Sequence, residues 1–151
     1  MGGPSLTEFA DRMNEIMPIL AKEFVRRHVS ELYKGKITLP QCLILEFLRR
    51  EGETKMTALA KFMNVSTAAM TGIVDRLVRS GYSVRARQLQ DRRIVKIKLT
   101  TSGQELVRKF HAHKRAMLIH IFSRVSERDR RDYLRVLTRI RDILTKEKET
   151  R

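Results

Sequence analysis

STAAMTGIVDRLVRSGYSVRARQLQDRRIVKIKLT, residues 66–100, decides the fold, because a helix signal is followed there directly by two strand signals. Ser66 is a favourable N-cap for the apolar-periodic run after it, and Gly81 stands where a helix stop is expected. Residues 82 to 87 and 94 to 99 alternate between apolar and polar side chains, which is typical of half-buried strands. The apolar residues of the first strand, which we expect on its buried face, are Tyr82, Val84 and Ala86. The stretch therefore predicts a capped helix followed by a β-hairpin.

The hairpin is strongly basic, which suggests contact with a polyanion. Arg85 and Arg87 share one face of the first strand, and Arg92 and Arg93 lie at or near the tip. Each phosphate that a cation contacts releases counterions, and an arginine gains further attraction in a narrow minor groove. We expect Asp91 to pair with Arg93 and to hold its guanidinium in one rotamer. The alternative is a solvated hairpin whose ion pair contributes only ~0–1 kcal/mol.

The start of the 66–80 helix carries small and hydroxylated side chains, which would let its backbone approach another molecule closely. It follows a short helix over 56–63 and a tight turn, the layout of a helix-turn-helix whose second helix enters the major groove. Hydroxyls and first-turn N–H groups can bind phosphate or base edges, and Arg76 lies further along the helix. The candidate contacts are Ser66, Thr67, Ala68, Thr71 and Arg76, and Gly72 is one of the small residues that allow close approach. The alternative is an ordinary solvent-facing helix, since helix-turn-helix shapes also occur in protein-binding domains.

Elsewhere the apolar residues recur at three- and four-residue steps, which indicates amphipathic helices. Thr38 is expected to cap the second helix, and Pro18 predicts a kink or a restart within the first. The expected helices cover about 6–32, 38–51, 56–63, 66–80, 100–122 and 127–144. The pattern predicts a mostly α protein with a small β-hairpin wing: six helices and a two- to three-stranded antiparallel sheet.

Composition narrows the class of partner. The 151 residues include 32 Lys and Arg against 17 Asp and Glu, a net charge of +15, which favours nucleic acid and, second, an anionic membrane surface. No apolar run approaches the ~18 residues of a spanning helix, and the N-terminus lacks a signal-peptide core. A single cysteine fits a reducing compartment, so a cytoplasmic protein without a membrane partner is expected. No nucleophile–base pair or phosphate loop is visible, so we expect no enzyme activity and no cofactor.

Three quieter features have ordinary and functional interpretations. Cys42 lies among apolar residues, so a buried inert thiol is favoured over a redox sensor. His111, His113 and His120 lack the i, i+4 spacing and the accompanying acids of a metal site, so we expect no bound metal. The methionines fit core and dimer packing, or the lining of an adaptable ligand pocket.

The chain resembles the MarR family of transcriptional regulators over about residues 10 to 145. The most specific part is Asp75–Arg76–Leu77, Gly81, Asp91–Arg92–Arg93, Leu99–Thr100 and then Gly103. The resemblance implies a homodimer on a pseudo-palindromic operator in double-stranded DNA, usually as a repressor. Members often release the operator when a small phenolic or other aromatic effector binds.

The same resemblance implies a division of the chain and roles for individual residues. Residues 34–100 would be the winged helix-turn-helix region, and 1–33 with 101–151 the helical dimerisation region, whose helices interleave. Ser66, Thr67, Ala68, Thr71 and Arg76 would contact DNA from the helix, and Asp91 and Arg93 would form the wing pair. The dimerisation residues would be Phe9, Met13, Ile16, Tyr133, Leu137, Ile140 and Leu144.

Two other functions also fit the sequence. A sequence-neutral architectural nucleic-acid binder would need little more than the net charge of +15. A winged-helix protein-interaction module would use the same fold without DNA. Affinity for a specific duplex relative to a scrambled one separates these possibilities.

Overall fold

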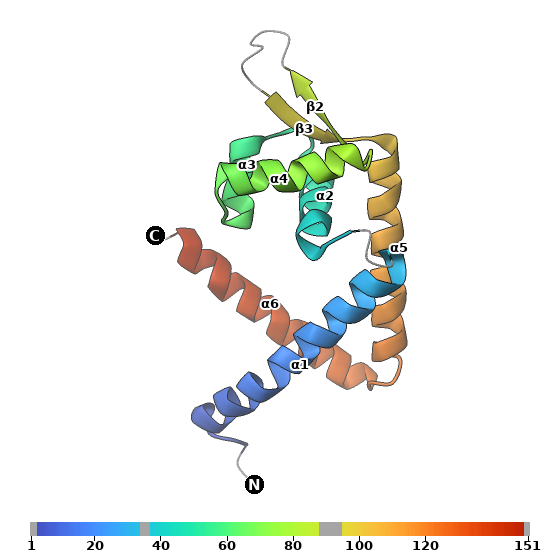
Figure 1. Ribbon diagram of the computed structural model, residues 1–151. Coiled ribbons are helices and arrows are strands. Elements are labelled where there is room, and N and C mark those ends of the chain that lie inside the picture. The colour runs from blue at the N-terminus through green and yellow to red at the C-terminus, as the bar shows by residue number, and fades with distance from the viewer. Residues whose placement is uncertain (1–2, 34–36, 88–94, 150–151) are drawn as a thin grey trace. The chain divides into compact units, whose positions relative to one another are not determined.

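The computed structural model describes residues 3–33, 37–87 and 95–149 and contains six helices and a three-stranded antiparallel sheet (Figure 1). In chain order the elements are α1 Leu6–Tyr33, α2 Leu39–Glu51, β1 Thr54–Lys55, α3 Met56–Met63, α4 Thr67–Arg79, β2 Ser83–Arg87, β3 Val95–Leu99, α5 Thr101–Phe122 and α6 Glu127–Glu149. The expected fold class is therefore confirmed. The chain divides into two compact units, Met1–His113 and Lys114–Arg151. None of the described helices has the length and apolarity that crossing a membrane requires.

Helix α1 continues through Pro18 as one element, so of the kink or restart expected at this proline, the restart does not occur. A proline removes one N–H from the helical ladder and crowds the preceding turn, but the hydrogen bonds on both sides of it can remain.

Local capping explains where α2 begins and ends. Thr38 and Gln41 form a capping box, in which the Thr38 N–H donates to Gln41 Oε1 at 2.8 Å and the Gln41 N–H points to Thr38 Oγ1 at 3.5 Å. Pro40 occupies the first turn, where its missing N–H costs nothing. Gly52, at φ +76°, ends the helix in a conformation that L side chains rarely adopt. The expected cap and stop are confirmed.

The core of the first unit forms where α2, α4, β3 and the first half of α5 meet. Helix α4 contributes Met70, Val74 and Leu77, each with no exposed surface, at the i, i+4, i+7 spacing of one helical face. The other large buried residues include Ile44, Leu45 and Leu48 of α2, Leu59 of α3, Ile97 of β3 and Val107 of α5. This packing turns the opposite face of α4 to solvent.

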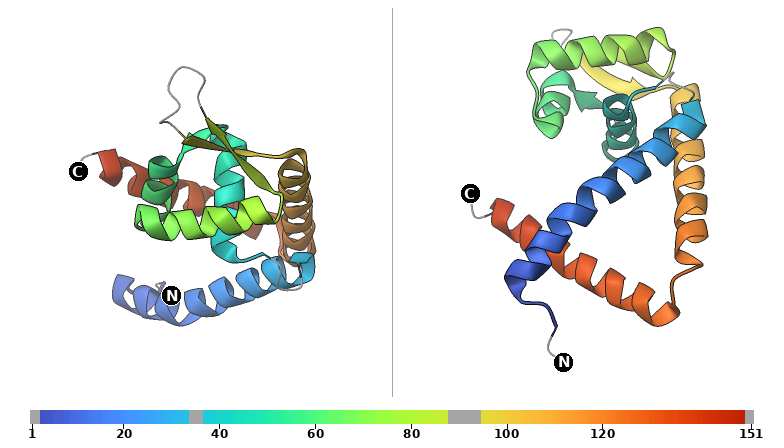
Figure 2. Two further views of the ribbon diagram at one scale, coloured as in Figure 1. Left: turned by 45° about the horizontal axis from the view of Figure 1, so that its top comes forward. Right: turned by 60° about the horizontal axis from the view of Figure 1, so that its bottom comes forward.

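The sheet has the order β1-β3-β2; Figure 2 shows the ribbon from two further directions. Ser83, Arg85 and Arg87 pair with Leu99, Ile97 and Val95, so the arginines share a sheet face with the buried Ile97. Ser83 is fully buried, whereas Val84 is 37% exposed. The expectation that Val84 and Ala86 lie on the buried face is therefore wrong; they share the outer face with Lys98 and Lys96.

A compact junction ties the end of α4 to the start of α5. Gly81, at φ +74°, follows α4, and its carbonyl accepts a hydrogen bond of 2.6 Å from the Thr100 hydroxyl. The Thr100 N–H donates to the Tyr82 carbonyl at 3.1 Å, and Thr100 Oγ1 accepts from the Gly103 N–H at 3.0 Å. Gly103 is buried so closely against Tyr82 that a Cβ there would collide with the Tyr82 carbonyl oxygen. These contacts fix the base of the wing.

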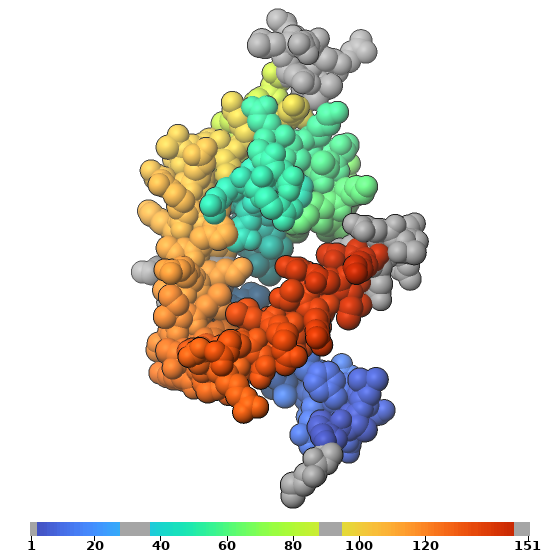
Figure 3. Space-filling model, turned by 180° about the vertical axis from the view of Figure 1, so that it is seen from behind, coloured from blue at the N-terminus to red at the C-terminus, as the bar shows by residue number. Residues whose placement is uncertain are grey.

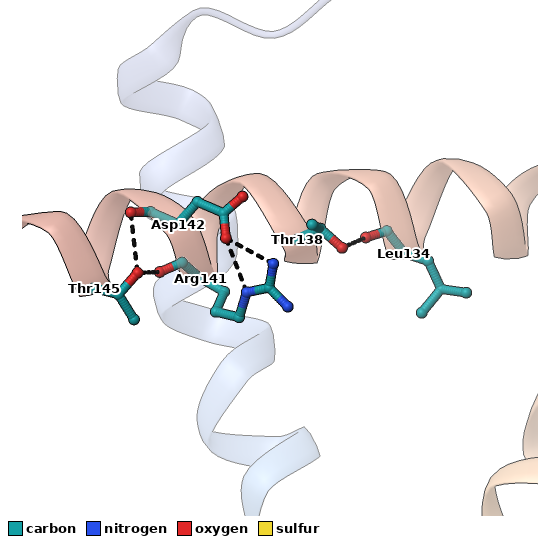
Figure 4. Close-up of polar contacts among 5 residues, drawn as sticks. All are labelled: Leu134, Thr138, Arg141, Asp142 and Thr145. Carbon is teal, nitrogen blue, oxygen red and sulfur yellow. Dashed lines mark hydrogen bonds and ion pairs between the residues drawn. The ribbon is translucent and has the colours of Figure 1, made fainter.

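In the second unit, Ser126 caps α6: Ser126 Oγ accepts from the Asp129 N–H at 3.1 Å and donates to Asp129 Oδ2 at 2.6 Å. Several polar side chains of α6 are satisfied within the helix itself, as Thr138 and Thr145 illustrate by donating to the Leu134 and Arg141 carbonyls at 2.8 and 2.9 Å (Figure 4). The apolar side chains of α6, in contrast, are widely exposed: Tyr133, Leu134, Val136, Leu137, Ile140, Ile143 and Leu144.

Candidate nucleic-acid interface

The exposed face of α4 begins at a well-formed cap. Ser66 Oγ accepts the Ala69 N–H at 3.1 Å, while Thr67 and Ala68 are exposed. The half-buried Thr71 donates its hydroxyl hydrogen to the Thr67 carbonyl at 2.8 Å, so this hydroxyl can offer only lone pairs to a ligand. Gly72 is exposed, and a Cβ there would have no heavy atom within 4 Å. The start of α4 therefore carries only short side chains, so another molecule can approach the helix backbone closely.

Two exposed arginines follow on the second half of α4. Arg76 is the expected one, and Arg79 is a residue that sequence reasoning missed. Arg79 lies three residues beyond Arg76, so helical periodicity alone could have placed it on the same solvent-facing side. The Arg79 Nε–H lies 3.5 Å from the Asp75 carbonyl, which is a long hydrogen bond. Both guanidinium groups can reach phosphates or base edges.

An ion pair joins this helix to the wing. Arg85 Nη2 of β2 lies 2.5 Å from Asp75 Oδ1 of α4. The side chains are 38% and 42% exposed, so solvent screens the pair, and we expect it to add only ~0–1 kcal/mol to stability. Its main consequence is geometric, because it holds the Arg85 guanidinium beside α4. Arg87 lies two residues further on the same strand face and is exposed.

This pair was not predicted from the sequence. The residues of β2 were expected to turn the opposite side toward the core, and no partner was expected for Asp75. The structure places Ser66 at the N-cap of α4, Thr67, Ala68, Thr71 and Arg76 on α4, and Arg85 and Arg87 on the adjoining strand. Asp91, Arg92 and Arg93, with the expected Asp91–Arg93 pair, lie outside the described residues.

A hollow of about 400 Å³ lies between α2, α3 and α5 of the first unit. The Phe47 and Phe62 rings form one wall at a centroid distance of 4.3 Å, and Arg50 lies over Phe47 at 5.4 Å. Glu46 Oε1 lies 3.8 Å from His111 Nε2. Figure 3 shows α2 and α3, in teal and green, beside the orange α5. The hollow thus combines aromatic surface with charged groups at its edge.

Among the described residues, no group of three His, Cys, Asp or Glu side chains could hold a metal ion.

Cys42 is buried, and this burial, with a smaller contribution from Glu46, raises the pKa of its thiol to about 12. The thiol is therefore protonated at neutral pH and a poor nucleophile. We expect a thiol-reactive chromophore to label native Cys42 at least ~100-fold more slowly than it labels the denatured chain. Rapid labelling of the native protein would contradict this assignment.

Because the Cys42 thiol ionises at lower pH in the unfolded chain than in the folded protein, the free energy of unfolding should also fall as pH rises from 9.0 toward about 12.

A helix-turn-helix with an exposed, capped second helix and an antiparallel wing beside it defines a winged helix-turn-helix protein. Residues 37–95 match the model of the MarR family. This region of the chain is therefore similar to the MarR family, as the sequence motifs indicated.

Curated relatives and solved structures agree with this placement. The chain is 34% identical over 106 residues to the HTH-type transcriptional repressor YetL of Bacillus subtilis (strain 168), covering 70% of this chain and 58% of the relative. It is 29% identical over 104 residues to the uncharacterized HTH-type transcriptional regulator YpoP of the same strain, covering 68% and 74%. The alignments thus span about half to three quarters of such relatives.

The same fold occurs in the structure of a MarR family protein from Bacillus stearothermophilus, with a TM-score of 0.83, 21% identity and coverage of 94% of this chain and 99% of the other. It also occurs in Streptococcus pneumoniae FabT in complex with DNA, with a TM-score of 0.79, 23% identity and coverage of 91% and 98%.

Proposed function

We propose that this protein is a sequence-specific, DNA-binding transcriptional regulator that acts as a homodimer, as a repressor, on a pseudo-palindromic operator. The observation that carries this proposal is the continuous exposed surface from the Ser66 cap through Gly72 to Arg76, beside an arginine that Asp75 holds in place. Small side chains permit close approach to a groove, and arginines supply contacts to guanine edges or phosphates. The DNA complex of FabT, which has the same fold, supports this docking.

The exposed apolar face of α6 supports the proposed dimer. Tyr133, Leu137, Ile140 and Leu144, spaced four, three and four residues apart, are between 41% and 56% exposed. This is the spacing of a helix seam that packs against another helix. On α1, Phe9 and Ile16 are exposed and Met13 is half-buried. A second copy of the chain would cover these side chains and could place two α4 helices about 34 Å apart, one turn of DNA.

Replacing Leu137 and Ile140 together with glutamine is expected to lower the mass in sedimentation equilibrium from that of two chains to that of one. Polar side chains remove the apolar burial that offsets the entropy of association. The matched control carries Arg135→Gln and Asp142→Gln, which lie on the opposite side of α6 and change no net charge. Helix content from circular dichroism checks both variants. A double variant that stays dimeric would place the interface elsewhere.

A small aromatic effector would complete the regulation. The hollow beside Phe47 and Phe62 supports this part of the proposal, because its aromatic wall suits a flat ring and His111 and Arg50 can meet a polar substituent. An effector shifts the protein only through different affinities for the DNA-competent and DNA-incompetent states. An effector that weakens DNA binding must therefore bind the DNA-free protein more tightly than the complex.

Selection of bound duplexes from a random pool tests the function, since it reports sequence preference and half-site spacing together. The selected duplex should bind at least about 10³-fold more tightly than a scrambled one at the same salt concentration. A ratio near one would favour the sequence-neutral architectural binder, which the net charge of +15 also supports. Absence of binding to any duplex at low salt would favour a protein-interaction module.

A further inference from the structure

The outer face of the winged sheet carries three lysines that the DNA-binding surface described above does not use. The register pairs Lys55 of β1 directly with Lys96 of β3, and Lys98 lies two residues further along β3 on the same face. We call Lys55, Lys96 and Lys98 the lysine face. It is opposite the sheet face that carries Arg85 and Ile97. The wing is therefore basic on both sides.

The lysine face is electrostatically unfavourable in the isolated protein. Like charges directly opposite each other on neighbouring strands destabilise a sheet, and Lys55 and Lys96 are such a pair. Within the described part of the chain, the one acid in an ion pair with this face is Glu53, whose carboxylate lies 3.7 Å from Lys98 Nζ. Positive charge is thus left over on the face, and an anionic partner would relieve the repulsion.

A basic hollow of about 550 Å³ adjoins the lysine face. Lys98 belongs to its lining, together with Arg49 of α2 and Arg108 of α5, while Glu53 is its single acid. Arg108 also lies 3.7 Å from Glu105. The hollow and the lysine face together form one basic surface within the first unit, on which three lysines and two arginines face few acids.

We propose that the lysine face and its adjoining hollow bind the phosphodiester backbone of the same duplex that α4 contacts. Lysine is a compact point charge that pairs with phosphate without reading bases, which suits this role. On the β2 side, Lys96 and Lys98 pair with Ala86 and Val84, whose short side chains leave room for a phosphate strand. A wing that is basic on both faces can contact backbone on both sides of the groove it enters. This inference rests on the proposed function, which supplies duplex DNA as the partner of the lysine face.

The test compares the salt dependence of duplex binding by the full chain and two triple variants. Lys55→Gln, Lys96→Gln and Lys98→Gln together should reduce the slope of log affinity against log salt by about 2 to 3 for each protomer bound, since each phosphate contact contributes ~0.9. The matched control, Lys22→Gln, Lys109→Gln and Lys114→Gln, removes the same charge from exposed sites on α1 and α5 and should leave the slope nearly unchanged. The ratio of selected to scrambled duplex affinity should stay at its wild-type value in both variants.

Three outcomes would overturn the proposal. A wild-type slope in the lysine-face variant means that these side chains touch no phosphate. An equal reduction in both variants means that only total charge matters. If the wild type binds a second duplex per dimer and the lysine-face variant does not, the occupant is a separate duplex. If the wild type binds selected and scrambled duplexes with nearly equal affinity, sequence-specific regulation is rejected but the lysine-face proposal is not. The comparison of salt slopes still tests whether the lysine face contacts phosphates.

Discussion

Replacing Gly103 with alanine is expected to lower the free energy of unfolding by about 2–3 kcal/mol, although it adds a single methyl group. A Cβ at this position would overlap the Tyr82 carbonyl oxygen and press on the Leu99 side chain at 3.3 Å. The carbonyl belongs to the backbone and already accepts the Thr100 N–H at 3.1 Å, so it cannot move aside without losing that bond. Urea unfolding followed by circular dichroism measures the loss.

Gly72→Ala is the matched control for this substitution, because a Cβ at position 72 of α4 meets no heavy atom within 4 Å. Alanine is the better helix former, so this variant should gain about 0.5–1 kcal/mol. Opposite signs for the same chemical change would show that the cost at Gly103 comes from close packing and not from the loss of a glycine. Wild-type stability of Gly103→Ala would mean that α5 can move away from Tyr82 at little cost.

The caps and helices could be predicted from the sequence because their determinants are local. Ser66 and Ser126 each bond to an N–H three residues ahead, so the sequence alone identifies the start of α4 and α6. The exposed residues that we propose to contact DNA follow the Ser66 cap directly, so their place at the start of α4 was also predictable.

The face of β2 could not be predicted, because its alternation is ambiguous. Val84 is more apolar than Ser83, yet the register places Ser83 opposite Leu99 on the buried side. The chain leaves α4 through Gly81 at φ +74°, and the Thr100 contacts at this point set which side of the next residues turns inward. Because the phase was wrong, the Asp75–Arg85 pair between residues ten positions apart could not be foreseen.

Replacing Gly72 with leucine is expected to weaken binding of the selected duplex by about 100-fold, or ~2.7 kcal/mol, while folding stability stays equal or rises. The glycine lies between the Ser66 cap and Arg76 on the exposed side of α4. A leucine there would hold the helix backbone away from the groove, so contacts from Thr67 and Arg76 would be lost together, each base contact contributing ~1–3 kcal/mol. Fluorescence anisotropy with a labelled duplex measures the affinity.

The control is Ala112→Leu, which adds a similar side chain to an exposed site on α5. It should bind the duplex as the wild type does. The series Gly72→Ala and Gly72→Leu then separates folding from docking, because stability should fall in neither variant while affinity falls steeply with side-chain size. Unchanged affinity in the leucine variant would mean that DNA does not meet this face of α4, and the assignment of α4 as the recognition helix would be lost. A Gly72→Leu variant that folds normally but loses DNA affinity would therefore support sequence-specific docking of α4. Neither a protein-interaction module nor a binder driven by net charge alone predicts this result.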